Sequence, residues 1–378
     1  MRDLNCKKKL GIGLIGFGNM GKAHLFSINS LSLFYENSDF SASVRGLCTA
    51  HPEKAESIAQ KHGIAAAYEN EDALIEADDI DVVDICTPNI YHFETVKKAI
   101  AAGKHILCEK PLCLTCDEAL ELCRLAKQAE EKGQICGVVF NNRFLSPIIK
   151  AKELIDNGGL GEIVSFRAEY LHNSCLDPSK KAGWKQTKEF GGGVLYDLGS
   201  HVIDLIYYLC GEFYSVFGME QIAFPERAGI DGKVWTTNAD EAFYLTATLK
   251  NGAKGTITAS KLTVGANDDL TVEIFGTKGA LRFSLMEPNW LYFYDSSADP
   301  LSGYTRIECV QRYGAPCTFP SPKAPQGWLR GHIGSMYSYL DCVAHGRRFS
   351  PSFEDSLHVI KIISAAYASA ENETVKLV

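Results

Sequence analysis

Short apolar runs alternate with helical patterns along the first third of the chain. The apolar runs cover residues 10–15, 43–48, 81–86 and 105–108, and the helical patterns between them cover residues 20–35, 52–62 and 91–102. A further helix follows the last run, because Thr115 and Glu118 form a capping box and Gly133 ends the pattern. This alternation predicts a doubly wound parallel sheet with crossover helices.

The pattern changes after residue 137, where strand-like alternation becomes common and favours a second, mainly antiparallel sheet. The predicted strands cover residues 163–170, 241–249, 253–260 and 270–275. The segment 288–325 is rich in Pro, Ser, Tyr and Gly and predicts loops, before helical patterns return at 333–344 and 356–370. We therefore expect an α/β protein with one domain over residues 1–137 and a second over 138–378.

Composition narrows the classes of partner. The chain has 378 residues, of which 46% are hydrophobic, enough to bury the cores of two domains. It carries 38 basic and 46 acidic residues, a net charge of -8 at pH 7. This charge repels phosphate backbones and anionic lipid surfaces, so we expect no nucleic-acid or membrane partner. The apolar run at residues 10–15 is too short for a signal or membrane segment.

The thirteen cysteines indicate the compartment. They are spread along the chain, and several, such as Cys48, Cys86 and Cys210, lie inside apolar runs. This distribution is typical of buried thiols in a reducing compartment, so we predict a cytoplasmic protein. Cys113 and Cys116 form a CxxC pair without a second pair or histidine at zinc spacing, so we predict a helix start there and no metal site.

A glycine motif follows the first predicted strand and opens the first helix: Gly16-Phe17-Gly18-Asn19-Met20-Gly21. In this context Gly16 permits a tight turn, Gly18 lets the backbone approach a pyrophosphate and Gly21 lets the helix pack closely on the strand. The helix N-terminus adds N–H donors and a positive dipole end. All six residues are therefore predicted to bind a dinucleotide cofactor.

The next predicted strand leaves the choice of cofactor open. A carboxylate at its end would bind the ribose hydroxyls, but this strand runs into Thr49-Ala50-His51. Thr49 and His51, with Lys54, could instead contact a ribose hydroxyl or a 2′-phosphate. We predict NAD or NADP, with NAD slightly favoured.

Two short clusters carry candidate chemistry. Glu109-Lys110-Pro111 follows a predicted strand, at the carboxyl end where open α/β sheets bind ligands. The proline biases Lys110 toward an extended backbone that can aim its side chain into a cleft, although a solvated surface lysine would fit as well. In the second cluster, three glycines precede a helical pattern that places Asp197 and His201 four residues apart on one face. Such a histidine can take a proton near neutral pH, and a structural helix pair is the alternative.

These clusters and two others occur in the order seen in Gfo/Idh/MocA oxidoreductases, which the chain resembles over nearly its whole length. The motifs are Gly16 to Gly21, Thr87-Pro88-Asn89 with His92, Glu109-Lys110-Pro111, Asn141-Asn142-Arg143-Phe144 and Asp197 to His201. The resemblance implies a Rossmann domain followed by an α/β domain whose open, mainly antiparallel sheet often mediates oligomerisation. We therefore expect a homo-oligomer, a dimer or tetramer formed through that sheet.

The resemblance also implies roles for single residues. Lys110, Asp197 and His201 correspond to the catalytic set. The cofactor contacts that it implies beyond the glycine motif are Thr87, Pro88, Asn89, His92, Glu109 and Lys110. Thr49 and His51 are added for their place after the second strand, and Thr49 departs from the family, many members of which carry an acidic residue there. The expected substrate contacts are Lys110, Asn141, Arg143, Asp197 and His201, and the loop before the three glycines adds His172 and Trp184 by its position. Trp184 could equally belong to the core.

The sequence thus predicts an NAD(P)-dependent oxidoreductase that transfers a hydride between the cofactor and a secondary alcohol of a sugar, inositol or glycoside. Two other functions stay open. A redox-neutral glycosidase or anhydrosugar-converting enzyme would oxidise its substrate only transiently, and a cofactor-sensing regulator would not turn over. The joint presence of Lys110, Asp197 and His201 argues against the regulator.

Overall fold

The computed structural model of the chain describes residues 8–229, 232–298, 303–310, 316–320, 324–325 and 327–378. The chain folds into two compact units. The first unit contains Met1–Phe144, Tyr313–Ala324 and Leu329–Leu357, and the second contains Leu145–Arg312, Pro325–Trp328 and His358–Val378. A segment from near the C-terminus therefore packs in the first unit, while the domain boundary at residue 137 stays a prediction.

Within the described residues, the first unit is built on a six-stranded parallel sheet. Its strands are β1 (Lys8–Ile15), β2 (Phe40–Cys48), β3 (Ala66–Tyr68), β4 (Val82–Ile85), β5 (His105–Glu109) and β6 (Cys136–Val139). They lie in the order β3-β2-β1-β4-β5-β6, so the strand order reverses between β1 and β4. The predicted doubly wound parallel sheet is confirmed, and ligands bind such sheets at the carboxyl ends of the strands beside the reversal.

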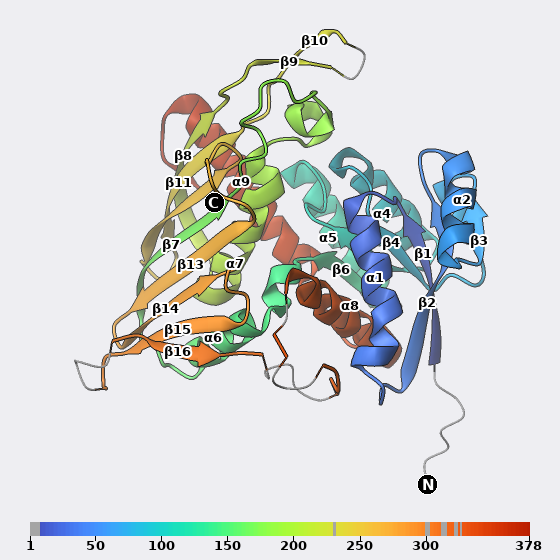
Figure 1. The fold of residues 1–378 in the computed structure, drawn as a ribbon, viewed down its shortest axis with the longest axis horizontal. Coiled ribbons are helices and arrows are strands. Elements are labelled where there is room, and N and C mark those ends of the chain that lie inside the picture. Colours follow the sequence, from blue (N-terminus) through green and yellow to red (C-terminus); the bar gives the residue numbers. More distant parts are fainter. Residues whose placement is uncertain (1–7, 230–231, 299–302, 311–315, 321–323, 326) are drawn as a thin grey trace. The chain divides into compact units, whose positions relative to one another are not determined.

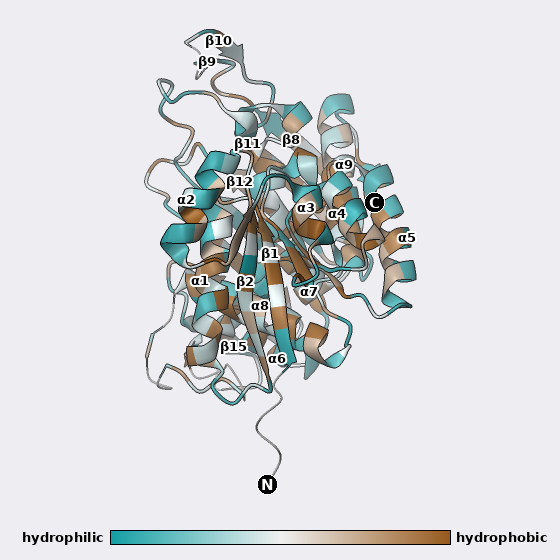
Figure 2. Ribbon diagram, turned by 90° about the vertical axis from the view of Figure 1, so that its right-hand side faces the viewer, coloured by the Kyte–Doolittle hydropathy of each residue, from teal (hydrophilic) through white to brown (hydrophobic). Residues whose placement is uncertain are grey.

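Helices pack on this sheet (Figure 1). They are α1 (Asn19–Phe34), α2 (Pro52–His62), α3 (Glu71–Glu76), α4 (His92–Ala101), α5 (Cys116–Glu130) and α8 (Trp328–His345). Figure 2 shows hydrophobic and hydrophilic residues together on α2, as expected for a helix with one face on a sheet. The capping box predicted for α5 is confirmed, because the Thr115 hydroxyl accepts the Glu118 N–H at 3.2 Å and the Glu118 carboxylate accepts the Thr115 N–H at 3.1 Å.

Helix α8 comes late in the sequence but shares the core of the first unit. Tyr339 is fully buried in the hydrophobic cluster that contains Ile12 and Leu14 of β1. Its hydroxyl donates to the Ile135 carbonyl oxygen at 3.1 Å. A fully buried side chain of this kind stabilises the fold by about 1.5–3 kcal/mol. The parallel sheet is therefore completed by residues from the far end of the chain.

The described part of the second unit is built on a nine-stranded sheet in the order β16-β15-β14-β13-β7-β12-β11-β8-β17. Its strands are β7 (Ile163–Leu171), β8 (Phe213–Gln221), β11 (Ala242–Leu249), β12 (Lys254–Ser260), β13 (Asp269–Gly276), β14 (Gly279–Ser284), β15 (Trp290–Asp295), β16 (Thr305–Glu308) and β17 (Lys376–Leu377). Only β7 and β12 run parallel among these described pairs, so the predicted mainly antiparallel sheet is confirmed.

Three helices lie along one face of this second sheet (Figure 1): α6 (Ser146–Asp156), α7 (Ser200–Cys210) and α9 (Phe353–Asn372). A separate antiparallel ribbon is formed by β9 (Glu226–Ala228) and β10 (Val234–Thr236). The sheet follows the expected alternation, as in β13, where Leu270, Val272 and Ile274 are buried and the residues between them are half-buried.

The prediction of loops for residues 288–325 is wrong in part, because β15 and β16 lie there and extend one edge of the sheet. The run that forms β15, Trp290-Leu-Tyr-Phe-Tyr-Asp295, consists mostly of residues that favour strands. The short β16 forms because β15 offers unpaired N–H and C=O groups along its edge. Residues 299–302, 311–315, 321–323 and 326 of the segment lie outside the described residues.

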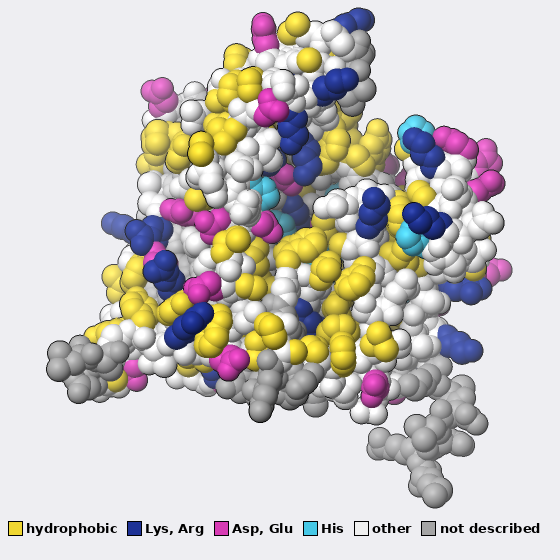
Figure 3. Space-filling model, viewed as in Figure 1, with side chains coloured by type: hydrophobic (Ala, Val, Ile, Leu, Met, Phe, Trp, Pro, Cys, Tyr) yellow, Lys and Arg dark blue, Asp and Glu magenta, His cyan; other side chains and the backbone are white. Residues whose placement is uncertain are grey.

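The surface charges, the apolar character of the helices and the cysteines all relate to the composition of the chain. Figure 3 shows acidic and basic side chains interspersed over the visible face, with hydrophobic side chains between them. No described helix has both the length and the apolar character needed to cross a bilayer. The cysteines of the described ranges form no disulfide with one another, and most of them are buried.

Candidate active site

The glycine motif forms the turn between β1 and α1. Gly16 has a φ of +95°, and a Cβ there would lie 2.6 Å from the Cys86 carbonyl oxygen. A Cβ at Gly21 would lie 2.3 Å from the Gly16 carbonyl oxygen, so the chain itself requires both glycines. At Gly18 a Cβ would meet nothing within 4 Å. The fold does not need a glycine at this position, and the open space fits a ligand that approaches the backbone.

A ligand at this turn would face the N-terminus of α1. The N-cap residue of α1, Gly18, offers no side chain to the first N–H groups, and the first turn of the helix holds no acidic residue. Unoccupied N–H donors and the positive end of the helix dipole favour an anion. The residues of the turn therefore fit the predicted pyrophosphate.

The end of β2 carries Thr49 and His51, which the sequence places near a ribose. The Thr49 hydroxyl donates to the His51 carbonyl oxygen at 2.9 Å and accepts the His51 N–H at 3.3 Å. The His51 side chain is 61% exposed and lies 3.7 Å from the Glu53 carboxylate. Both side chains lie at the surface, and their contact with a cofactor stays a prediction.

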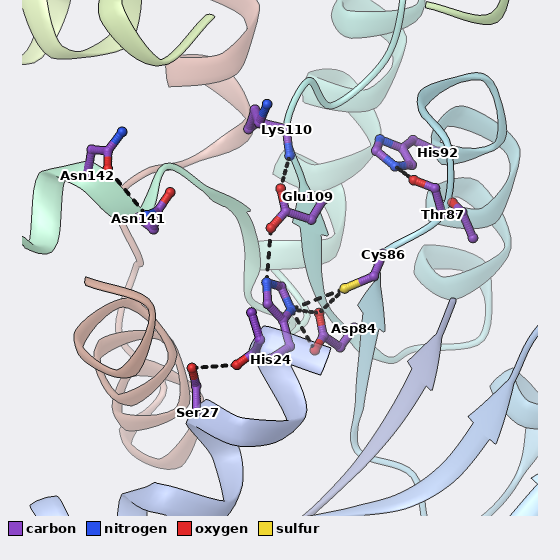
Figure 4. A network of polar contacts seen from close by, with 11 residues as sticks. His24, Ser27, Asp84, Cys86, Thr87, His92, Glu109, Lys110, Asn141 and Asn142 are labelled. Carbon is purple, nitrogen blue, oxygen red and sulfur yellow. Dashed lines mark hydrogen bonds and ion pairs between the residues drawn. The ribbon is translucent and has the colours of Figure 1, made fainter. Parts of the chain in front are cut away.

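A buried polar network joins three elements of the first unit (Figure 4). The His24 side chain of α1 binds the Asp84 carboxylate of β4 through Nδ1 at 2.9 Å, and the Glu109 carboxylate of β5 through Nε2 at 3.0 Å. The other Glu109 oxygen accepts the backbone N–H of Lys110 at 3.1 Å. The three side chains of the network are at most 7% exposed. The network therefore links the helix of the glycine turn to the backbone of Lys110.

Opposite charges hold this network together. Burial disfavours a charged ring, but the Asp84 carboxylate and the Cys86 thiol hold the pKa of His24 well above its ordinary value. Burial also opposes ionisation of Glu109, yet the hydrogen bond and charge of His24 lower its pKa to about 2. His24 is therefore an imidazolium between two carboxylates at neutral pH. Burial and the His24 charge keep the nearby His332 ring neutral and lower its pKa to about 3.

The same side chains have the spacing of metal ligands. Ligand atoms of His24, Glu109 and His332 lie within 4.8 Å of one another, as do those of His24, Asp84 and Cys86. His24 is hydrogen-bonded to Asp84 and Glu109 in this cluster. The absence of a metal site, expected from the sequence, stays a prediction.

Lys110 follows β5 at the carboxyl edge of the sheet, and Figure 4 shows its side chain pointing away from His24. The residue after Lys110, Pro111, is held by His92. The Nδ1 atom of His92 lies 2.7 Å from the Pro111 carbonyl oxygen, and its Nε2 atom lies 2.9 Å from the Thr87 carbonyl oxygen. Burial lowers the pKa of His92, although the hydrogen bonds to these two carbonyl oxygens act to raise it. His92 is fully buried, so it supports the loops after β4 and β5, and its contact with the ribose stays a prediction.

The Thr87 hydroxyl is a further candidate for a cofactor contact. It is buried and has no hydrogen-bond partner among the described residues. Unsatisfied buried hydroxyl groups are uncommon and call for an explanation such as a ligand. The cofactor contacts of Pro88 and Asn89, which follow it, stay predictions.

Asn141, Asn142 and Arg143 are all buried in the first unit. The Asn141 amide donates to the Asn142 side-chain oxygen at 3.3 Å (Figure 4). The Arg143 guanidinium donates to the Ser350 hydroxyl at 3.2 Å and to the Asp355 carboxylate at 3.3 Å. These bonds give Arg143 a structural role, and the substrate contacts of Asn141 and Arg143 stay predictions.

In the second unit, three glycines lead into a π-helical turn, Leu195–Gly199, before α7 begins at Ser200. A Cβ at Gly193 would lie 2.2 Å from an Asp240 carboxylate oxygen, so only glycine lets the chain pass there. The other oxygen of Asp240 accepts the Leu195 N–H at 2.8 Å and fixes the start of the turn. The regular helix that the sequence suggested around Asp197 is replaced by this π turn, a rare form that is frequent at functional sites.

Asp197 lies in the π turn and binds two lysines through one oxygen. Its Oδ2 lies 2.9 Å from Lys185 Nζ and 2.7 Å from Lys261 Nζ. The Lys185 side chain is 47% exposed, whereas that of Lys261 is 7% exposed. Burial opposes charge on Lys261, but the Asp197 carboxylate raises the pKa of the ammonium above its ordinary value. One exposed ammonium and one buried ammonium therefore contact Asp197, the residue predicted to bind the substrate.

His201 lies in the first turn of α7, with its ring centroid 5.9 Å from that of Tyr170 in an edge-to-face arrangement. The Tyr170 hydroxyl donates to Asp268 Oδ1 at 2.6 Å, and His172 Nε2 lies 2.8 Å from the same oxygen. Burial opposes ionisation of Asp268, but these two bonds lower its pKa. Trp184 is only partly buried, and its contact with substrate stays a prediction. The fold thus gathers His172 and His201 around Tyr170.

Sequence reasoning missed three of the residues that hold these sites together, namely His24, Asp84 and Lys261. A usable signal existed for Lys261, because a charged residue directly follows the predicted strand 253–260. His24 lies three residues after Gly21 and is followed by the apolar pair Leu25-Phe26, which is a weaker signal. Its two carboxylate partners could not be found without the strand order.

Comparisons with known proteins agree with this architecture. Residues 10–139 match the family described as "Oxidoreductase family, NAD-binding Rossmann fold", and residues 148–282 match the "GFO/IDH/MocA C-terminal domain". Levoglucosan dehydrogenase of Pseudarthrobacter phenanthrenivorans is 32% identical over 97% of this chain and 97% of its own. Glucose-6-phosphate 3-dehydrogenase of Bacillus subtilis is 30% identical over 96% of each chain.

A solved structure of levoglucosan dehydrogenase in complex with NADH and levoglucosan superposes with a TM-score of 0.93. It is 31% identical in sequence and covers 98% of this chain and 100% of its own. The similarity therefore extends over both units.

Proposed function

This chain belongs to the GFO/IDH/MocA oxidoreductases, and we propose that it transfers a hydride between NAD and a secondary hydroxyl group of a sugar, inositol or glycoside. One observation carries the proposal: at Gly18, beside the reversal of strand order, the turn leaves open the space that a pyrophosphate needs. The substrate class is supported by relatives that span nearly the whole chain, a levoglucosan dehydrogenase and a glucose-6-phosphate 3-dehydrogenase.

NAD, and not NADP, is the cofactor in this proposal. Residues 49–54, which follow β2, contain Lys54 but no arginine of the kind that binds a 2′-phosphate, and Glu53 offsets the charge of the lysine. The similar solved structure was obtained with NADH. When bound, the nicotinamide accepts the hydride that leaves the substrate carbon.

Three side chains share the proposed chemistry. His201 takes the proton of the substrate hydroxyl as the C–H bond of the same carbon breaks. The Lys110 ammonium stabilises the negative charge that grows on the hydroxyl oxygen. Asp197 accepts a hydrogen bond from a substrate hydroxyl and so orients the ring. Glu109, held by His24, fixes the backbone from which Lys110 projects.

A panel of substrates tests the function directly. The protein is incubated with NAD or NADP and with anhydrosugars, glucosides, hexoses, hexose phosphates or inositols, and the absorbance of reduced nicotinamide is followed. We expect reduced cofactor to accumulate with at least one sugar, and with NAD in preference to NADP. Absence of turnover with the whole panel would reject the proposal.

The same assay separates the two rival functions. A redox-neutral enzyme would change the sugar, seen by chromatography, without net accumulation of reduced nicotinamide. A cofactor-sensing regulator would bind NAD in calorimetry but leave every sugar unchanged.

Gly18→Val should abolish NAD binding while leaving the fold intact. The valine side chain would occupy the space over the turn, although the protein itself places nothing within 4 Å of a Cβ there. Calorimetry should show at least about a hundredfold loss of NAD affinity, the size expected when a pyrophosphate is kept from its N–H donors. The melting temperature should stay within a few degrees of wild type. Normal NAD affinity in a folded variant would place the cofactor elsewhere.

The protein is proposed to form a dimer or tetramer through the sheet face opposite α6, α7 and α9. Met219 of β8 and Tyr244 of β11 are cross-strand neighbours and are 55% and 40% exposed. Exposed apolar pairs of this kind are common where a sheet is covered by a partner. Light scattering should give two or four times the mass of one chain, and the mass of a single chain at micromolar concentration would contradict this.

The cytoplasm is the compartment that we propose. The described cysteines are reduced thiols, and most of them are buried. Thiols persist where glutathione and thioredoxin keep them reduced.

A further inference from the structure

One oxygen of Asp197 binds two ammonium groups that lie in very different surroundings. Lys185 lies in a single turn of 3-10 helix, Trp184–Gln186, and its side chain is about half exposed. Lys261 directly follows β12 and is 7% exposed. Ion pairs between exposed groups contribute little, because solvent screens the charges and both side chains lose freedom. The two lysines should therefore differ greatly in their effect on Asp197.

The backbone of Lys261 is fixed on both sides. Its N–H donates to the Glu241 carbonyl oxygen at 2.8 Å, and its carbonyl oxygen accepts the Cys175 N–H at 2.9 Å. The ammonium therefore projects from a rigid point at the end of the sheet, and it meets Asp197 Oδ2 at 2.7 Å. A donor fixed in this way can hold a carboxylate in one orientation.

Other anionic groups near Lys261 are already engaged. The Glu241 carboxylate binds the Arg227 guanidinium at 2.7 Å, with both side chains 2% exposed. The Asp240 carboxylate accepts from Leu195 N–H and from the Tyr367 hydroxyl. Asp197 is thus the counter-ion of Lys261. A buried ammonium is costly, and an apolar residue would often stabilise the fold as well, so its presence points to a task other than stability.

We propose that Lys261 is a positioning residue of the substrate site, whose buried ammonium holds Asp197 as a charged, oriented acceptor for a substrate hydroxyl. The inference rests on the proposed function, which makes Asp197 a substrate ligand. An aspartate held ionised by an ammonium does not take the hydroxyl proton. That proton is left to His201.

A matched pair of variants tests the inference, Lys261→Met and Lys185→Met. Each removes one ammonium from the same Asp197 oxygen and keeps a linear side chain of similar length. Calorimetry measures how tightly the best sugar of the panel binds to the complex of each variant with NADH. Lys261→Met should weaken sugar binding about tenfold or more, and Lys185→Met by less than about threefold. NADH affinity should be unchanged in both, because the glycine turn lies in the first unit.

The pH dependence of sugar binding separates a charge effect from a packing effect. Asp197 is faced by Lys185 from the preceding loop, by Lys261 from the end of β12 and by Tyr170 from β7, and His201 follows in α7. A carboxylate that loses a cation takes up a proton more readily. As the pH is lowered, sugar affinity should therefore begin to fall at a higher pH in Lys261→Met than in wild type. In Lys185→Met it should begin to fall at the same pH as in wild type.

Two further variants keep the test decisive if Lys261→Met does not fold. Lys261→Gln retains an N–H donor without the charge and should weaken binding like Met, whereas Lys261→Arg retains the charge and should restore most of the affinity.

Equal effects of the two lysines, or wild-type affinity and pH dependence in a folded Lys261→Met, would overturn the inference. A wild-type protein that binds sugar without turnover would refute the proposed function alone, and one that binds no sugar would refute both.

Discussion

His201→Asn should lower the rate of sugar oxidation by about a hundredfold or more, the usual contribution of a general base. Asparagine keeps the polarity and much of the reach of histidine but cannot accept a proton near neutral pH. NAD affinity should barely change, because the glycine turn belongs to the first unit and His201 to the second. Turnover and cofactor affinity are measured in parallel, by steady-state kinetics and by calorimetry.

The pH profile gives the sharper evidence for His201. Only the neutral imidazole accepts a proton, so oxidation by the wild type should rise with pH as His201 loses its proton. Reduction of the ketone should show the opposite dependence, because the imidazolium must then donate the proton. Both pH dependences, that of oxidation and that of reduction, should disappear in His201→Asn.

His358→Asn is the matched control for His201→Asn. His358 lies in the same unit and stacks on Tyr207 of α7, with ring centroids 4.7 Å apart. This variant should keep the wild-type rate and pH profile. If His201→Asn behaved like His358→Asn, His201 would be a structural residue and another group would have to be the base.

Lys110→Ala should lower turnover by about a hundredfold to a thousandfold, the usual effect of removing one donor from a developing oxyanion. The substitution removes the ammonium but keeps the backbone N–H that the Glu109 carboxylate accepts at 3.1 Å. The polar network of His24, Asp84 and Glu109 should therefore stay in place. The loss should appear in kcat more than in KM, since the charge on the oxygen grows only as the C–H bond breaks.

Calorimetry and thermal melting are the controls for Lys110→Ala. NAD affinity should stay within about threefold of wild type, because the pyrophosphate is bound by the N-terminus of α1. Lys110→Arg, which keeps the charge on a longer and wider group, should recover part of the turnover. Full turnover in Lys110→Ala would assign the stabilisation of the oxyanion to another residue.

Local patterns in the sequence determine much of this protein. The parallel sheet and its helices follow from the alternation of apolar runs with helical periodicity, and the capping box of α5 follows from Thr115 and Glu118. The glycine turn follows from Gly16 to Gly21, because φ at Gly16 and the packing at Gly21 exclude other residues. Each of these features depends on residues close together in the chain, whose preferences act before any distant contact forms.

Features that join distant residues were decided only by the tertiary structure. The sequence did not reveal that α8 packs in the first unit, that β15 and β16 extend the second sheet, or that a π turn holds Asp197. Nor did it indicate a partner for His24, which meets carboxylates 60 and 85 residues away, or for Lys261, which meets Asp197. A buried charge is stable only beside its counter-charge, and which residues become neighbours depends on strand order and packing, which the local pattern does not specify.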